Sequence, residues 1–256
     1  LTKETKVLVV DIGGGTTDCS MLLMGPDFIN CTSRTEHLLA HSGIRIGGND
    51  FDIKLALKGI MPSLGLNDFL KTGKPMPVNN FNQAVAINNV NEQTKFYSAA
   101  NRRALTELLR DAEKPDAFAK LIKVHDYKLS HAVVNDAEQA KIGLTDNISQ
   151  AIDLSYLADT DKNSTNDNHC SSVDVSRKLM QEASASLLKQ IGQMMDDAVT
   201  QSGTEPDIIF VTGGSAKSPV LNEFLKAKMP NTPLIVGDLF GSVTGGLTRW
   251  ADRIFT

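Results

Sequence analysis

Three absences narrow the classes to which this 256-residue protein can belong. Only three cysteines occur, none in a C-x-x-C pair, which argues against a zinc site and a disulfide framework: Cys19, Cys31 and Cys170. No apolar run reaches the roughly 18 residues of a membrane span, and no signal peptide is recognised. The net charge is 26 − 30 = −4, so no basic surface for nucleic acid or membrane is expected. We therefore expect a cytoplasmic globular protein.

Short apolar runs at the start of the chain predict three strands joined by short turns into an antiparallel meander, at residues 6–10, 16–23 and 28–40. The next hundred residues are mostly helical in pattern. Helices are expected at 49–57, 99–110, 115–124 and 129–142, and the Gly- and Pro-rich stretch 61–80 is expected to be loop with short helical pieces.

The second half predicts a strand over 148–157, a polar loop or hairpin tip over 159–170, and a long amphipathic helix over 176–201. A β–turn–α–β–α unit follows, with strands at 207–212 and 234–236 and helices at 219–228 and 243–254. We predict an α/β fold in which the two ends of the chain share one mixed sheet. The core would comprise 1–46 and 173–256, and 47–172 would form an inserted helical subdomain with a short sheet.

The turn between the first two strands, Asp11-Ile-Gly-Gly-Gly-Thr-Thr-Asp18, carries the strongest functional signal. Glycines let bare backbone approach phosphate oxygens, which successive N–H groups can bind. Asp11 could hold a hydrated magnesium ion, with Thr16 and Asp18 across the turn. A plain glycine-rich hairpin is the alternative, although a hairpin needs neither three glycines nor two flanking carboxylates. No Gly-Lys-Ser/Thr follows, so this is not a Walker loop, and the glycines do not open a helix as a Rossmann motif requires.

Two further glycine segments precede predicted helices. Gly213-Gly214-Ser215, followed by Lys217, suits an anion or nucleotide site, or simply a tight strand-to-helix connection. Gly47-Gly48 precedes Asn49 and Asp50, either of which can cap a helix.

Glu138 and Lys141 lie three residues apart on a predicted helix, where a solvated ion pair is the simple interpretation. Five histidines show no metal-ligand spacing.

In this order the motifs resemble the actin/DnaK superfamily of ATP-binding proteins, above all the DnaK-type heat-shock chaperones and their divergent bacterial YegD-like group. The resemblance rests on Val9–Asp18, Gly47–Asp52, Ala137–Leu144 and Val211–Pro219, with Gly241–Gly246 similar to a terminal glycine-bearing helix start. It implies an actin-like, ribonuclease H-like ATPase lobe that uses ATP or ADP with Mg²⁺, and K⁺ as a further cation.

The resemblance also implies roles for single residues. Asp11 would bind hydrated magnesium, and Thr16 and Asp18 would make catalytic and monovalent-cation contacts. The phosphates would be wrapped by Gly13, Gly14, Gly15 and Thr16. The ribose and adenine would contact Glu138, Lys141 and Thr145, and the opposite wall of the pocket would consist of Gly213, Gly214, Ser215 and Lys217.

Three positions depart from the family pattern. Ile142 and Lys217 stand where the chaperones carry arginines, and lysine lacks the planar face with which arginine stacks on adenine. Asn49 replaces a glutamate. These departures suggest weakened or altered adenine recognition.

The chain begins at Leu1 without a Met and contains no second acid–glycine hairpin, so we expect a fragment that carries the C-terminal lobe of a two-lobed ATPase domain. It would bind Mg–ATP against an N-terminal lobe and would be inactive alone. Unfolded polypeptide and co-chaperones are the further partners that the resemblance implies. A lobe of a small-molecule kinase and an actin-related scaffold or nucleotide-binding protein without turnover are the alternatives.

Overall fold

The computed structural model describes residues 2–28, 37–158 and 172–237, together with Gly245, Thr248, Ala251 and Asp252. The chain divides into two compact units. Unit 1 comprises Leu1–Asp50 and Ala185–Thr256, and unit 2 comprises Phe51–Ser184. Two helices, α1 (Gly48–Leu55) and α7 (Arg177–Ser202), run from one unit into the other.

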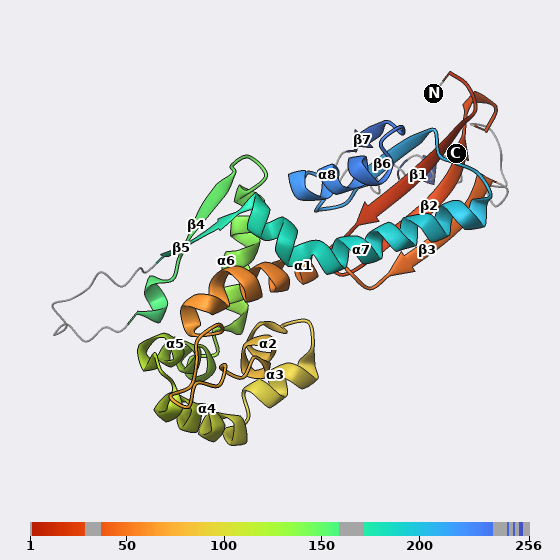
Figure 1. Cartoon of the computed structure of the whole chain (residues 1–256). Coiled ribbons are helices and arrows are strands. Elements are labelled where there is room, and N and C mark those ends of the chain that lie inside the picture. Colours follow the sequence, from red (N-terminus) through yellow and green to blue (C-terminus); the bar gives the residue numbers. More distant parts are fainter. Residues whose placement is uncertain are drawn as a thin grey trace. The chain divides into compact units, whose positions relative to one another are not determined.

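Unit 1 is built on a five-stranded mixed sheet in the order β3-β2-β1-β6-β7 (Figure 1). The strands are β1 (Thr5–Ile12), β2 (Thr17–Met24), β3 (Leu38–Ile44), β6 (Ile208–Thr212) and β7 (Leu234–Val236). β1, β2 and β3 pair antiparallel, whereas β6 pairs parallel to β1 and to β7. The predicted α/β fold with a mixed sheet is therefore confirmed.

Helices α7 and α8 (Pro219–Lys228) supply apolar side chains to the core of unit 1. The two helices touch closely, because a Cβ atom on Gly192 of α7 would lie 2.9 Å from Cζ of Phe224. The apolar positions of α7 recur at helical spacing and are buried, as expected of an amphipathic helix: Leu187, Leu188, Ile191, Met194, Met195 and Ala198.

Unit 2 is mostly helical. After α1 the chain forms a π-helical turn (Ala56–Ile60) and a 3₁₀ turn (Met61–Leu64). Its other helices are α2 (Asn79–Val85), α3 (Val90–Phe96), α4 (Ala99–Asp111), α5 (Pro115–Asp126) and α6 (Ser130–Gly143). A two-stranded antiparallel sheet, β4 (Ser149–Asp153) with β5 (Ser172–Ser176), precedes α7. Phe81, Phe96 and Phe118 are fully buried among the helices.

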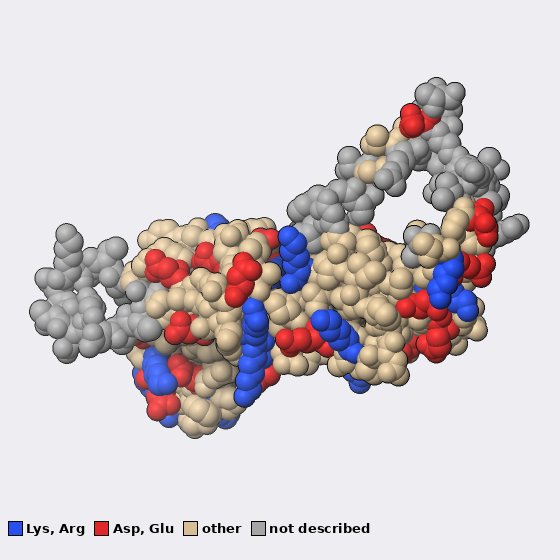
Figure 2. Space-filling model, turned by 90° about the horizontal axis from the view of Figure 1, so that it is seen from above, with Lys and Arg blue, Asp and Glu red and all other residues tan. Residues whose placement is uncertain are grey.

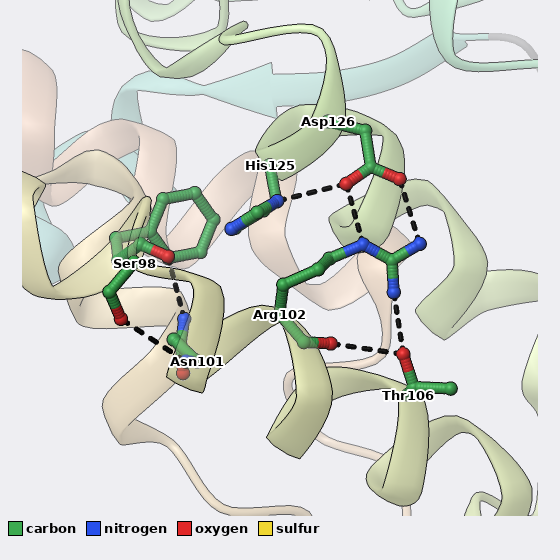
Figure 3. Close-up of polar contacts among 7 residues, drawn as sticks. Ser98, Asn101, Arg102, Thr106, His125 and Asp126 are labelled. Atoms are coloured by element: carbon green, nitrogen blue, oxygen red, sulfur yellow. Dashed lines mark hydrogen bonds and ion pairs between the residues drawn. The ribbon is translucent and has the colours of Figure 1, made fainter.

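A polar cluster joins α4 to α5 within unit 2 (Figure 3). The Arg102 guanidinium donates two hydrogen bonds to Asp126, at 2.6 and 2.9 Å, and a third to Thr106 Oγ1 at 2.6 Å. Nδ1 of the buried His125 lies 2.9 Å from Asp126 Oδ1. Bidentate arginine–carboxylate pairs fix direction as well as distance, so this cluster links α4 to the end of α5 in a defined orientation.

The structure corrects several predicted boundaries. Of the strand predicted over 28–40, residues 29–36 lie outside the described residues; the described third strand is Leu38–Ile44, and Pro26–Phe28 form a 3₁₀ turn. The strand expected over 148–157 is only Ser149–Asp153, and its partner β5 was not predicted. Helices α2 and α3 were also missed. All of these elements are short, and β5 is defined by its pairing with β4 rather than by its own composition. The expected helix over 243–254 and the segment Gly241–Gly246 lie largely outside the described residues.

Among the described residues, no helix combines the length and apolar character needed to cross a membrane. On the face drawn in Figure 2, the coloured acidic and basic side chains are interspersed. That distribution agrees with the nearly balanced charge of the sequence.

Candidate functional site

Three loops of unit 1 meet at one edge of the sheet. The strand register pairs Asp11 with Asp18 across β1 and β2, and Asp11 with Thr212 across β1 and β6. Thr17, which begins β2, pairs with Ile44, which ends β3. The chain therefore leaves β1, β3 and β6 at the same edge, where Figure 1 shows the strands side by side. Ligands of α/β sheets bind outside the carboxyl ends of strands, so this edge is the candidate site.

The first loop, between β1 and β2, is closed by a hydrogen bond from the Gly13 N–H to the Thr16 carbonyl at 2.9 Å. Gly14, Gly15 and Thr16 are exposed, and a Cβ atom on Gly15 would meet nothing within 4 Å. The loop thus presents open backbone to solvent. Such a surface suits an anionic group bound by main-chain N–H groups.

The second loop lies directly on the first. A Cβ atom on Gly47 would stand 2.4 Å from the Gly15 nitrogen, so only glycine allows this contact. The N–H groups of Gly48 and Asn49 donate to the carbonyls of Gly13 and Gly14, at 2.9 and 2.8 Å. These donors of the α1 N-terminus therefore hold the glycine turn in place.

Asn49 or Asp50 was expected to be the N-cap residue of α1, but Asp50 instead lies inside the helix and contributes to the cap through its side chain. Its Oδ2 accepts a hydrogen bond from the Gly47 N–H at 2.9 Å. Because α1 begins at Gly48, Asp50 is the third helical residue and its side chain reaches back to the residue before the helix, as in half of a capping box. The buried hydroxyl of Thr17 further anchors this segment, since it donates to the Ile46 carbonyl at 2.7 Å.

The third loop, between β6 and α8, packs against the end of β1. Gly213 has a φ of +89°. A Cβ atom there would stand 2.4 Å from the Ile12 carbonyl oxygen and 2.6 Å from Asp11 Oδ1. Gly214 and Lys217 are exposed and Ser215 is half-buried. The Asn222 side chain of α8 donates to the Ala216 carbonyl at 2.9 Å and ties the loop to the helix.

Two carboxylates flank the glycine turn. Burial, and after it the nearby charge of Asp18, raises the pKa of Asp11 above its usual value. Asp18 is half exposed, and its Oδ1 lies 4.0 Å from His41 Nε2. Gly43 leaves room for this carboxylate, because a Cβ atom on Gly43 would stand 2.8 Å from Asp18 Oδ1.

This donor set fits a hydrated magnesium ion. Within the described part of the chain, no group of three or more His, Cys, Asp or Glu side chains converges as metal ligands. Magnesium keeps several waters and often binds through one or two carboxylates together with substrate phosphates. Asp11 and Asp18 beside an exposed glycine turn meet that requirement.

The candidate residues of unit 2 lie on α6 or directly after it. Lys141 forms an ion pair with Asp52 of α1, with Nζ 2.7 Å from Oδ1, and the two side chains are 15% and 3% exposed. Glu138 and Thr145 are half-buried, and Ile142 is 54% exposed. The Arg177 guanidinium donates to the carbonyls of Leu144 and Thr145, at 2.8 and 2.7 Å. α6 therefore ends in a loop fixed by the start of α7.

At one edge of the sheet, the structure brings together the predicted residues of unit 1: Asp11, Gly13–Thr16, Asp18, Gly47, Gly48 and the Gly213 loop. Glu138, Lys141 and Thr145 lie in unit 2. Sequence reasoning missed Asp52 and Asn222. A carboxylate between the apolar Phe51 and Ile53 was the available signal for Asp52, whereas nothing in the sequence marked Asn222.

No model of a known protein family matches the chain. The chain is similar to the chaperone protein DnaK of Mycoplasmoides gallisepticum, with 24% identity over 258 residues. The match covers 96% of this chain but 33% of DnaK, so the chain spans about a third of the length of that relative. The similarity points to the DnaK and actin-like ATPase superfamily. The mixed five-stranded sheet is compatible with a lobe of that fold.

Proposed function

We propose that this chain is the C-terminal lobe of the ATP-binding domain of a DnaK-like ATPase, in the YegD-like branch, and that it binds Mg–ATP together with an N-terminal lobe. The main support is the contact of three glycine loops at the carboxyl edge of the sheet. There Gly47 touches Gly14 and Gly15, and Gly213 touches Asp11. A plain hairpin would not need two further loops packed against it through positions that only glycine can occupy.

In this proposal the exposed backbone of Gly14 and Gly15 binds the phosphates, and Asp11 and Asp18 hold the hydrated cation. Thr16 lies at the same turn and contacts the transferred phosphoryl group. The Gly213–Lys217 loop serves the nucleoside. Glu138, Lys141 and Thr145 are assigned to the ribose and adenine on the resemblance alone.

Mg²⁺ would neutralise the charge that develops on the phosphoryl group as it passes to water. The residues of this chain then act by position and charge. The carboxylates hold the cation beside the turn, and the N–H groups orient the phosphate oxygens. Because the proposed partner lobe contributes the rest of the site, this chain alone should show little turnover.

Isothermal titration calorimetry of the full-length protein with Mg–ATP tests the proposal, with ATP turnover measured in parallel. Asp11→Asn should lower both affinity and turnover at least tenfold, because one of the two carboxylates that balance the cation loses its charge. Asp197→Asn, an exposed carboxylate on α7, serves as the matched control and should change neither. Absence of Mg–ATP binding by the wild-type protein would refute the proposal.

Nucleotide binding without turnover is a second candidate, favoured by the exposed Ile142 at the end of α6 and by the exposed Lys217. Neither side chain offers the planar cation of an arginine. The turnover assay separates the two candidates, since robust hydrolysis that Asp11→Asn abolishes would exclude this second one.

A further inference from the structure

His41 of β3 stands beside Asp18 of β2 without a hydrogen bond between them. The strand register sets His41 directly opposite Ser20, and Asp18 lies on the same face of β2 as Ser20 because side chains alternate along a strand. The His41 Nε2 atom lies 4.0 Å from Asp18 Oδ1, which is too far for a hydrogen bond. Within the described part of the chain, neither Nε2 nor the Asp18 carboxylate has a hydrogen-bond partner.

Ser20 holds the His41 ring from its other side. The His41 Nδ1 atom lies 2.9 Å from Ser20 Oγ. A histidine that binds a metal ion through one ring nitrogen usually donates the N–H of the other nitrogen to a nearby acceptor. With its proton on Nδ1, the imidazole of His41 donates to the Ser20 hydroxyl, and the lone pair of Nε2 is left available next to Asp18.

The space between the two atoms suits a divalent transition metal ion. Zinc binds imidazole nitrogen and carboxylate oxygen at about 2 Å, so two such ligands in a tetrahedral arrangement stand about 3.3 Å apart. The side chains of His41 and Asp18 are 55% and 51% exposed, so small rotations can close the remaining distance. An imidazole ligand favours zinc, whereas magnesium takes oxygen ligands.

We propose that His41 Nε2 and Asp18 Oδ1 bind a Zn²⁺ ion, with His41 as the ligand that selects zinc over magnesium. No third His, Cys, Asp or Glu of the described residues joins the pair, so water completes the coordination. The proposed function gives His41 no part, and this inference therefore goes beyond it. Asp18 can serve both ions, because a carboxylate has two oxygen atoms.

Isothermal titration calorimetry of the full-length protein with zinc chloride, in the absence of nucleotide, tests the site. His41→Asn removes the imidazole and should lower the affinity for one Zn²⁺ ion about tenfold or more, since half of the protein ligands are lost. Asp18→Asn should have a similar effect. Ser20→Ala should weaken binding less, by about threefold, because water can replace the hydroxyl beside an exposed ring.

His131→Asn is the matched control, because His131 is an exposed histidine on α6, in the other unit. It should leave the zinc titration unchanged. Mg–ATP provides the second readout. His41→Asn should keep the affinity for Mg–ATP within about twofold of wild type, because magnesium is bound through oxygen, whereas Asp18→Asn should lower the affinities for both Zn²⁺ and Mg–ATP.

The failure of this inference and that of the proposed function give different results. If wild type and His41→Asn bind Zn²⁺ with equal affinity and stoichiometry, the zinc site is overturned and the proposed function stands. If wild type binds no Mg–ATP but loses a zinc ion on His41→Asn, the proposed function fails and the zinc site stands. Thermal unfolding of His41→Asn with a chelator present should match wild type, because the side chain is exposed.

Discussion

The backbone of Gly213 lies against the carboxylate of Asp11, so that a Cβ atom on Gly213 would stand 2.6 Å from Asp11 Oδ1. Asp11 lies near the end of β1 and Gly213 directly follows β6, the parallel neighbour of β1, so the two residues are separated by most of the chain. The contact places the first loop of the candidate site directly against the third.

Gly213→Ala should therefore be costly. Its φ of +89° is unfavourable for any residue with a Cβ atom, and the added methyl group would collide with the Ile12 carbonyl. We expect a loss of about 2 kcal/mol or more in the free energy of unfolding, measured by urea denaturation. Gly214→Ala is the control, because a Cβ atom there would meet nothing within 4 Å. Equal stability of the two variants would contradict the close contact.

Gly47→Ala should act on the glycine turn from the other side. The added Cβ atom would fall 2.4 Å from the Gly15 nitrogen, and both partners are backbone that cannot rotate away. A loss of about 2 kcal/mol in the free energy of unfolding is expected from overpacking, and Gly15→Ala should cost much less because its Cβ atom would point into open space. Urea unfolding of Gly47→Ala and Gly15→Ala measures this difference, and equal losses of stability would contradict the close contact between Gly47 and Gly15.

Removing one member of the ion pair between Asp52 and Lys141 should destabilise the protein more than replacing both members. Lys141→Met leaves the 3%-exposed carboxylate of Asp52 without its ammonium partner, and we expect a cost of about 3 kcal/mol. The double variant with Asp52→Leu should recover much of that loss, since replacing both members of a buried pair is often near neutral. A double-mutant cycle in denaturant measures the coupling, and additive losses would contradict a direct interaction.

The cluster around Asp126 should make the free energy of unfolding depend on pH in the acidic range. Burial raises the pKa of Asp126, but the hydrogen bonds from Arg102 and His125 outweigh it and hold that pKa below its usual value. A carboxyl whose pKa is lower in the folded state contributes stability above its unfolded value of about 4, and that contribution is lost as pH falls through the folded value.

Arg102→Met should flatten this dependence, because it removes the donor that keeps Asp126 ionised. Unfolding midpoints of wild type and variant, followed from pH 7 to 2, are expected to converge at the acid end. Arg103→Met, an exposed neighbour on α4, is the control. If the difference in unfolding midpoint between wild type and Arg102→Met stays constant down to pH 2, the pair of Arg102 and Asp126 does not contribute to stability.

Elements with strong local signals were predicted well. The helix over 219–228 begins at Pro219, whose fixed φ suits a first turn, and the structure has it at the same residues. The long helix over 176–201 appears as Arg177–Ser202, because its apolar stripe repeats through the whole length. β3 and β5 were misplaced or missed, since each is defined by pairing with another strand rather than by its own composition.

Within the candidate site, residue types could be read from the sequence, but their neighbours could not. Three glycines between two carboxylates suffice to indicate a phosphate turn, because few other structures need that combination. Nothing local predicts that Lys141 pairs with Asp52 rather than with Glu138, three residues away, because Asp52 lies far from Lys141 in sequence and is brought beside it only by the fold of unit 2.

The sequence alone determined the α/β class, the long helices and the acid–glycine turn at Asp11–Asp18, since these depend on periodicity and on residue types close together in the chain. The tertiary structure decided that Gly47 and Gly213 lie against that turn. Such contacts arise only when the sheet brings the carboxyl ends of β1, β3 and β6 to one edge. A glycine in the sequence shows that a side chain is absent, but only the folded structure shows which atoms a side chain there would meet.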